Sequence, residues 1–278
     1  MDLRGKTALV TGASSGLGAA FAKQLAKDGA NLVITARRKK NLDALKEELE
    51  RSHRVTVATI ELDLSEADAP ARLFREAEAI APIDVLVNNA GGGIHQRFLD
   101  IEWDRTLRQI QLNVVSLTEL TWAFGRAMRD RGTGYILNVS SIGAYTPSPT
   151  YATYSAGKAF VRDFSEALAY ELAGSGVRVC SLCPGGTITE FHQAAGHDIN
   201  KTFRSTFQSA DECAAVGLAA LFAGRRNVVS GLLNKVMMWS LRFTPRRVMI
   251  WTAAKTMGEP KEPARFSGGR AVGDPSGG

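Results

Sequence analysis

The sequence has only three cysteines among 278 residues and no uninterrupted apolar run near the roughly 18 residues that a membrane-spanning helix needs. The low cysteine content excludes a small domain held together by disulfides, and a chain of this length can bury a large core without them. Its first residues lack the apolar segment of a signal peptide, so we expect a cytoplasmic protein.

Two of the cysteines, Cys180 and Cys183, have the C-x-x-C spacing of redox and metal sites. They fall in an expected strand, where positions i and i+3 face opposite sides, and no second pair of ligands accompanies them. We therefore expect free, buried thiols and no metal site.

Acidic residues are missing from one long stretch of a chain whose formal net charge is +6. Residues 1–212 carry 24 basic and 25 acidic side chains, residues 213–258 carry 7 basic and none acidic, and residues 259–278 carry 3 of each. The excess charge thus lies in a single segment. The balanced main body argues against a protein that binds nucleic acid.

Apolar runs alternate with helical periodicity over most of the chain. The expected strands are residues 7–10, 32–35, 55–62, 83–87, 135–139, 177–182 and 228–231, and the expected helices are residues 17–27, 42–49, 69–80, 103–128, 153–172 and 211–222. This alternation predicts an α/β fold with a doubly wound parallel sheet and helices on both faces. No break starts a second domain before residue 258, and the glycine- and proline-rich residues 259–278 are expected to form a disordered tail.

The first expected strand leads directly into the glycine-rich segment Thr11–Gly18. Glycines between a strand and a helix allow a tight turn and a close approach of a pyrophosphate, and the helix N-terminus offers free N–H groups to it. The residues expected to bind a dinucleotide here are Gly12, Ser14, Ser15, Gly16, Leu17 and Gly18. An ordinary tight turn is the alternative, because the spacing G-x-x-x-G-x-G is not the usual G-x-G-x-x-G.

The end of the second expected strand carries Arg37 and Arg38, where a site for NAD usually has an acidic residue. Arginine suits a 2′-phosphate, so the segment favours NADP(H) over NAD(H), although a solvated run of charges is the alternative. Asp63 and Leu64 end the next strand, where the carboxylate could meet the adenine amine.

Tyr154 and Lys158 lie four residues apart on one face of an expected helix, and Ser141 follows the preceding strand. An ammonium beside a phenol favours the phenolate and lowers its pKa from about 10. Such a tyrosine can exchange a proton with a carbonyl or carbinol oxygen, which the Ser141 hydroxyl could hold.

Together these motifs resemble those of the short-chain dehydrogenase/reductase family over roughly residues 3–235. The matching pieces are Thr11–Gly18, Asp63, Asn88–Gly91, Asn113, Ser140–Ser141, Tyr154 with Lys158, and Pro184–Gly185 followed by Thr187. The resemblance implies a seven-stranded Rossmann-type sheet and hydride transfer between a nicotinamide and a carbonyl/alcohol pair.

The resemblance also implies a role for each matching residue. Tyr154 would be the acid/base, Ser141 the donor to the substrate oxygen, and Lys158 the ligand of the nicotinamide ribose. Asn113 would support a proton-relay water. The residues that would further line the cofactor are Asn89, Ala90, Gly91, Pro184, Gly185 and Thr187. Ser140 is an alternative to Ser141, and family members often pair helices such as 103–128 and 153–172 in homodimers or homotetramers.

The segment of about residues 187–210 is expected to cover the substrate as a lid. Aromatic side chains such as Phe191, with Ile142 and Tyr145 as further pocket walls, suit a bulky apolar ketone. The same aromatic residues would equally suit a lid that packs only on its own protein.

The basic segment, residues 225–258, interleaves Arg and Lys with Trp, Phe and Met. This composition is typical of a helix lying on an anionic membrane, but it also suits packing on the protein's own body or on a second subunit. The alternative to an enzyme is a regulatory protein on the same fold that binds the cofactor. Such a protein would not need Ser141, Tyr154 and Lys158 together, and all three are present.

Overall fold

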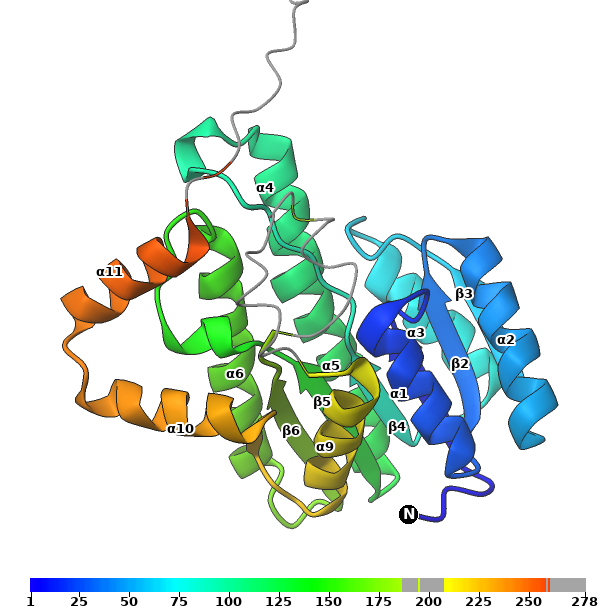
Figure 1. The fold of residues 1–278 in the computed structure, drawn as a ribbon. Coiled ribbons are helices and arrows are strands. Elements are labelled where there is room, and N and C mark those ends of the chain that lie inside the picture. Colours follow the sequence, from blue (N-terminus) through cyan, green and yellow to red (C-terminus); the bar gives the residue numbers. More distant parts are fainter. Residues whose placement is uncertain (187–194, 196–207, 259, 261–278) are drawn as a thin grey trace, which may run out of the picture.

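Seven parallel strands form one sheet in the computed structural model, which describes residues 1–186, 195, 208–258 and 260 (Figure 1). The strands are β1 (Thr7–Thr11), β2 (Asn31–Ala36), β3 (Val57–Glu61), β4 (Val85–Asn88), β5 (Gly134–Val139), β6 (Val177–Cys183) and β7 (Asn227–Val229). Their order across the sheet is β3-β2-β1-β4-β5-β6-β7. The expected Rossmann-type, doubly wound sheet is confirmed. Thr187, Phe191 and most of the expected lid lie outside the described residues, as does the expected tail apart from Pro260.

Two apolar clusters cover the two faces of this sheet. The helices of one face are α1 (Gly16–Lys27), α2 (Lys39–His53) and α9 (Ala210–Phe222), and those of the other face are α3 (Ala69–Ile80), α5 (Ser116–Asp130) and α6 (Ala152–Glu171). Leu9 and Val10 are consecutive in β1 and belong to different clusters, as the two-residue period of a strand requires. Both faces of the strands are therefore buried.

The winding of the sheet changes direction between β1 and β4. From β1 the chain continues through β2 and β3 towards one edge, whereas β4 pairs with the other side of β1 and leads to the opposite edge. Ligands of such folds bind in the crevice beyond the carboxyl ends of the strands at this point. Thr11 ends β1 and Asn88 ends β4, so the glycine-rich loop and residues 89–91 meet there.

The long helix expected over residues 103–128 is interrupted, which corrects the prediction. It consists of α4 (Trp103–Ile110), a π-helical turn η2 (Gln111–Val115) and α5. The wider turn contains Asn113, whose side chain is buried. Single π turns inside α-helices occur frequently at functional sites.

A buried polar network joins the sheet to α5 and α6. The Asn138 side chain accepts a hydrogen bond from Asn88 Nδ2 (3.0 Å) and one from the Thr121 hydroxyl (3.3 Å), and it donates one to Ser165 Oγ (3.0 Å). All four residues are at most 2% exposed. Buried polar groups need such partners, so the network fixes α6 against β5.

The basic segment forms two helices that project beside α6 on the left of Figure 1. They are α10 (Leu232–Ser240) and α11 (Arg246–Met257), joined through the short turn η4 (Leu241–Phe243). Met238 is the one fully buried residue of the two helices. Within the described ranges, no helix has the length and apolarity to cross a membrane.

Candidate active site

A cleft of about 1220 Å³ opens at the carboxyl edge of the sheet, where the winding changes direction. It extends from the glycine-rich loop past Ser141, Tyr154 and Lys158 to the last turn of α11. Pockets for a single small ligand occupy roughly 300–1,000 Å³, so this cleft has room for two ligands side by side. The cofactor-binding residues predicted before position 187 all line it: Gly12, Ser14, Ser15, Gly16, Leu17, Gly18, Arg37, Arg38, Asp63, Leu64, Asn89, Ala90, Gly91, Tyr154, Lys158, Pro184 and Gly185.

The glycine-rich loop is shaped for a close approach to the backbone. Gly12 has a φ of +68°, and a β-carbon there would lie 2.9 Å from Ala90 Cα. A β-carbon on Gly18 would lie 2.2 Å from the Gly12 carbonyl oxygen. Only glycine fits these two positions, and the loop leads into the N-terminus of α1, as a pyrophosphate site requires.

Thr11 and Asn89 hold the loop against the end of β4. Thr11 Oγ accepts hydrogen bonds from the backbone N–H groups of Asn89 (3.0 Å) and Ala90 (2.9 Å), and Asn89 Nδ2 donates to the Thr11 carbonyl (2.9 Å). Thr11 was not singled out from the sequence as a site residue. Its place directly before Gly12, at the end of a buried strand, is the signal that could have found it.

Arginine side chains border the loop at one end of the cleft. Arg38 donates to Ser15 Oγ at 2.6 Å and to Ser14 Oγ at 3.2 Å, so it lies across the loop. Arg37 is exposed and lies 3.7 Å from the Asp63 carboxylate. Partial burial raises the pKa of Asp63, but hydrogen bonds from Ser65 and the charge of Arg37 outweigh this effect and lower it. Cation and carboxylate thus meet next to the loop.

The cleft fits a dinucleotide in a further respect. Thr35 lines the cleft, and its buried hydroxyl has no hydrogen-bond partner among the described residues. On the far side of the loop, a β-carbon at Gly91 would lie 3.0 Å from Asn113 Oδ1 and 3.3 Å from Lys158 Nζ. The residues present therefore fit a group that approaches the main chain closely and brings polar atoms of its own.

Tyr154 and Lys158 lie in the first turns of α6, below Ser141 at the end of β5. Burial raises the pKa of Tyr154 to about 12, against the lowering effect of its hydrogen bond with Ser141. Burial lowers the pKa of Lys158 to about 8. Burial thus outweighs the predicted lowering of the tyrosine pKa by lysine. Lys158 Nζ donates to the Val139 carbonyl at 2.8 Å and lies 5.8 Å from the tyrosine ring centre.

The two adjacent serines differ in their partners. The Ser140 hydroxyl donates to the backbone carbonyl of Lys158 at 2.6 Å, which links β5 to α6. The Ser141 hydroxyl bonds Tyr154 and accepts the N–H of Gly143 at 3.0 Å. Ser141 is thus the serine next to the phenol, as the spacing favours.

Asn113 uses both ends of its side-chain amide on one glycine. Its Nδ2 donates to the Gly92 carbonyl at 2.7 Å, and its Oδ1 accepts the Gly92 N–H at 3.0 Å. The π turn brings the asparagine to this position. Asn113 therefore fixes the loop of three consecutive glycines, 91–93, whose backbone is otherwise free to adopt many conformations.

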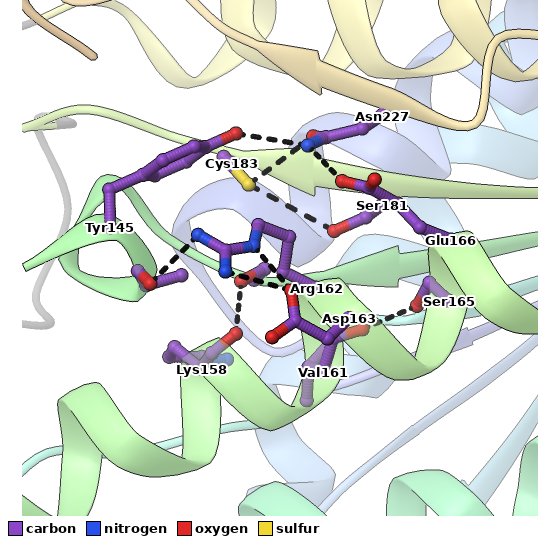
Figure 2. A network of polar contacts seen from close by, with 12 residues as sticks. Tyr145, Lys158, Val161, Arg162, Asp163, Ser165, Glu166, Ser181, Cys183 and Asn227 are labelled. Atoms are coloured by element: carbon purple, nitrogen blue, oxygen red, sulfur yellow. Dashed lines mark hydrogen bonds and ion pairs between the residues drawn. The ribbon is translucent and has the colours of Figure 1, made fainter. Parts of the chain in front are cut away.

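Tyr145 does not line the cleft, unlike Ile142, its predicted companion in the substrate pocket. Figure 2 shows its hydroxyl near Asn227, which donates to it at 2.9 Å and also bonds Glu166. The Arg162 guanidinium lies 4.6 Å from the centre of the Tyr145 ring. These contacts turn the ring towards a second cavity beside β7 and α10, and the prediction of a pocket wall is corrected.

Several cleft residues were missed from the sequence. Tyr151 lines the cleft and meets the Tyr154 ring edge to face at 5.7 Å. It also stacks on the buried side chain of His95. Residues 255–258, at the end of α11, also line the cleft, although they lie about 100 positions after Tyr154 in the chain. No pattern in the sequence indicates that this segment returns to the site.

The three cysteines are buried thiols outside any disulfide, as predicted. The part of the chain that the structure describes contains no cluster of His, Cys, Asp and Glu suited to a metal ion.

Comparisons with known proteins agree with this geometry. The family model described as short chain dehydrogenase matches residues 6–200. Galactitol 2-dehydrogenase (L-tagatose-forming) of Cereibacter sphaeroides is 40% identical over 191 residues, which cover 68% of this chain and 74% of that protein.

Solved structures extend the similarity to the fold. A short-chain dehydrogenase from Sphingobium yanoikuyae in complex with NADPH has a TM-score of 0.78 and 32% identity, covering 88% of this chain and 95% of that one. The bulky-bulky ketone specific alcohol dehydrogenase from Comamonas testosteroni has a TM-score of 0.73 and 27% identity, with coverages of 88% and 96%.

Proposed function

Since this chain belongs to the short-chain dehydrogenase/reductase family, we propose that it interconverts a ketone and a secondary alcohol with NADP(H). The observation that carries the proposal is the meeting of Ser141, Tyr154 and Lys158 in the cleft that the glycine-rich loop also lines. A bound nicotinamide would supply or accept the hydride. The protein's own part is to hold the substrate oxygen and to move a proton to or from it.

Tyr154 is the proposed proton donor. With a pKa of about 12, its phenol is protonated at neutral pH and can donate to a carbonyl oxygen during reduction. In the oxidative direction the same oxygen must receive the proton, so a lowered tyrosine pKa would be required. Ser141, which already bonds the phenol, would donate to the same substrate oxygen and orient it.

Lys158 has donors left over for a ligand. One of its three N–H bonds goes to the Val139 carbonyl, which leaves two for hydroxyl groups such as those of a ribose. A β-carbon added to Gly91 would lie 3.3 Å from Lys158 Nζ. The ammonium therefore lies beside the loop of glycines 91–93, where no side chain separates it from a ligand. Asn113 acts there as a positioning residue through Gly92, and its predicted relay water stays a prediction.

The preference for NADP(H) rests on Arg37 and Arg38. Arg38 lies across Ser14 and Ser15, so two hydroxyls and a guanidinium face one point of the cleft rim. This set of donors suits a 2′-phosphate, which arginine can bind through two N–H groups. Asp63 pairs with Arg37 and could alternatively hold an adenine amine. A solved relative in complex with NADPH supports the same choice.

The proposed substrate is bulky and apolar. Ile94, Ile142 and Met257 give the cleft apolar lining in addition to the residues predicted to hold the cofactor. The similarity to an alcohol dehydrogenase specific for bulky-bulky ketones supports this class. A homodimer or homotetramer remains our expectation from the family.

Replacement of Tyr154 by phenylalanine tests the proposed proton transfer. We expect the turnover of bulky ketones with NADPH to fall by about 10²- to 10⁴-fold, which is the usual contribution of a general acid. Binding of NADPH, measured by fluorescence titration, should persist. The matched control is Tyr145→Phe, which removes a hydroxyl outside the cleft and should leave turnover within a few-fold. Full turnover by Tyr154→Phe would refute the assignment.

A second experiment tests the cofactor and substrate class. Arg38→Ala should raise the KM for NADPH by about 10- to 100-fold, the value of a charged hydrogen bond, with a much smaller effect on NADH. Lys40→Ala, an exposed neighbour at the start of α2, is the control. Equal losses for the two cofactors would contradict the 2′-phosphate site. A substrate panel of bulky ketones and polyols, with NADPH or NADP⁺, then decides the substrate class.

A further inference from the structure

The segment formed by α10, η4 and α11, residues 232–257, is here called the helical arm. It exposes an unusual number of large apolar side chains. On α10 and η4, Leu232, Val236, Trp239 and Phe243 follow one another at spacings of four, three and four residues and are 57% to 78% exposed. This spacing places them along one side of the helix, opposite the buried Met238. On α11, Val248 and Trp251 are also exposed.

The charge of the arm is of one sign. Its five ionised side chains are Lys235, Arg242, Arg246, Arg247 and Lys255. All are exposed, and none pairs with a carboxylate among residues that the structure describes. The sequence has no acidic residue between positions 213 and 258. Large apolar side chains gathered on one exposed surface and bordered by charged residues are typical of an interaction site.

The arm also touches the cleft at two points. A β-carbon on Gly185, which lines the cleft, would lie 2.0 Å from Asn234 Nδ2 in the first turn of α10. At the other end, residues 255–258 form part of the cleft wall. A surface bound to the arm would therefore lie next to the cleft.

From these observations we infer that the helical arm is a docking surface for an anionic lipid bilayer. Exposed Trp, Phe, Leu and Val beside unpaired Arg and Lys are the combination that binds the interface of such a membrane. A second copy that packed arm against arm fits less well, because such a two-fold interface would set the five cations of one arm against the five of the other. The described part of the protein covers little of the arm, since Met238 is the one buried residue of its two helices.

Vesicle flotation of the full chain tests the charge dependence. We expect binding to vesicles of mixed phosphatidylcholine and phosphatidylglycerol, weakened by salt, and little binding to phosphatidylcholine alone. Arg242→Gln/Arg246→Gln should weaken the partition by about 30-fold, at the usual contribution of each basic residue near an anionic surface. The control Arg51→Gln/Arg75→Gln removes two exposed arginines elsewhere and should change it less than about twofold. No binding to the anionic vesicles, or equal loss in both variants, would overturn the inference.

The four tryptophans provide a test of orientation. Trp239 and Trp251 lie in the arm, Trp103 and Trp122 lie on α4 and α5, and all are 59% to 63% exposed. The variant Trp103→Phe/Trp122→Phe keeps only the two arm tryptophans, and brominated lipids should quench its fluorescence. The variant Trp239→Phe/Trp251→Phe keeps only the tryptophans of α4 and α5, and its fluorescence should stay unquenched.

The opposite quenching pattern would overturn the inference. So would an arm that stays unquenched while Arg242→Gln/Arg246→Gln dissociates a dimer in sedimentation, since the occupant would then be a second copy. These readouts need no turnover, so they are independent of the proposed enzymatic activity.

Discussion

Lys158 should lower the stability of the protein at neutral pH, because it is a charged group that is only 4% exposed. Burial lowers its pKa from 10.5 to about 8. Between these values the unfolded chain binds more protons than the native one, so the stability of the wild type rises with pH through this window. At 1.36 kcal/mol per pKa unit, the penalty at neutral pH is about 3 kcal/mol.

Lys158→Met removes this charge and also the hydrogen bond from Nζ to the Val139 carbonyl. Leaving that carbonyl without its partner costs about 1–2 kcal/mol. We therefore expect the variant to be more stable than the wild type by about 1–2 kcal/mol at neutral pH and less stable by a similar amount above pH 10.5, where the native lysine is neutral. Its carbonyl reduction should be lost.

Urea unfolding followed by circular dichroism, from neutral pH to above pH 10.5, measures both signs. Lys40→Met, at an exposed position, is the control and should leave the pH dependence unchanged. A variant at Lys158 that is destabilised equally at both ends of the range would refute the buried-charge argument.

Two further substitutions test the framework of the site. Asn138→Ala removes three buried hydrogen bonds, and we expect a loss of about 3 kcal/mol in the free energy of unfolding. A loss below about 1 kcal/mol in urea titration would show that the network is not stabilising. Gly18→Ala forces a β-carbon to 2.2 Å from the Gly12 carbonyl, so NADPH affinity should fall more than about tenfold by titration, at an overpacking cost of 1–3 kcal/mol. Gly125→Ala meets Ile136 at the ordinary distance of 3.5 Å and should bind NADPH normally.

The sheet was predictable because each strand is a short apolar run buried on both faces. All seven expected strands are present, and their ends differ by a few residues at most. The helices were harder to delimit. Residues 42–49 cover only the apolar part of α2, which extends from Lys39 to His53. The first and last turns were missed because their residues are mostly charged and exposed, so they carry no apolar periodicity.

The π turn at residues 111–115 illustrates what periodicity cannot reveal. Apolar residues continue at helical spacing through residues 103–128, and no proline or glycine marks the interruption before Gly125. The turn coincides with the paired hydrogen bonds between Asn113 and Gly92, which are 21 residues apart. Tyr145 is a similar case, because its orientation depends on Asn227, 82 residues later.

The residues of the cleft fall into two groups: side chains that share one helix face, and side chains that bond main-chain groups elsewhere in the chain. Tyr154 and Lys158 were found because both lie on one helix face, where a fixed spacing has a chemical meaning. Ser140 bonds the main chain of Lys158, and Asn113 bonds the main chain of Gly92 in the glycine loop of the cleft. A backbone carbonyl is present at every position, so such a contact leaves no pattern of residue types along the chain. That these side chains share one cleft could therefore be predicted from spacing, whereas the contacts that hold them in place required the structure.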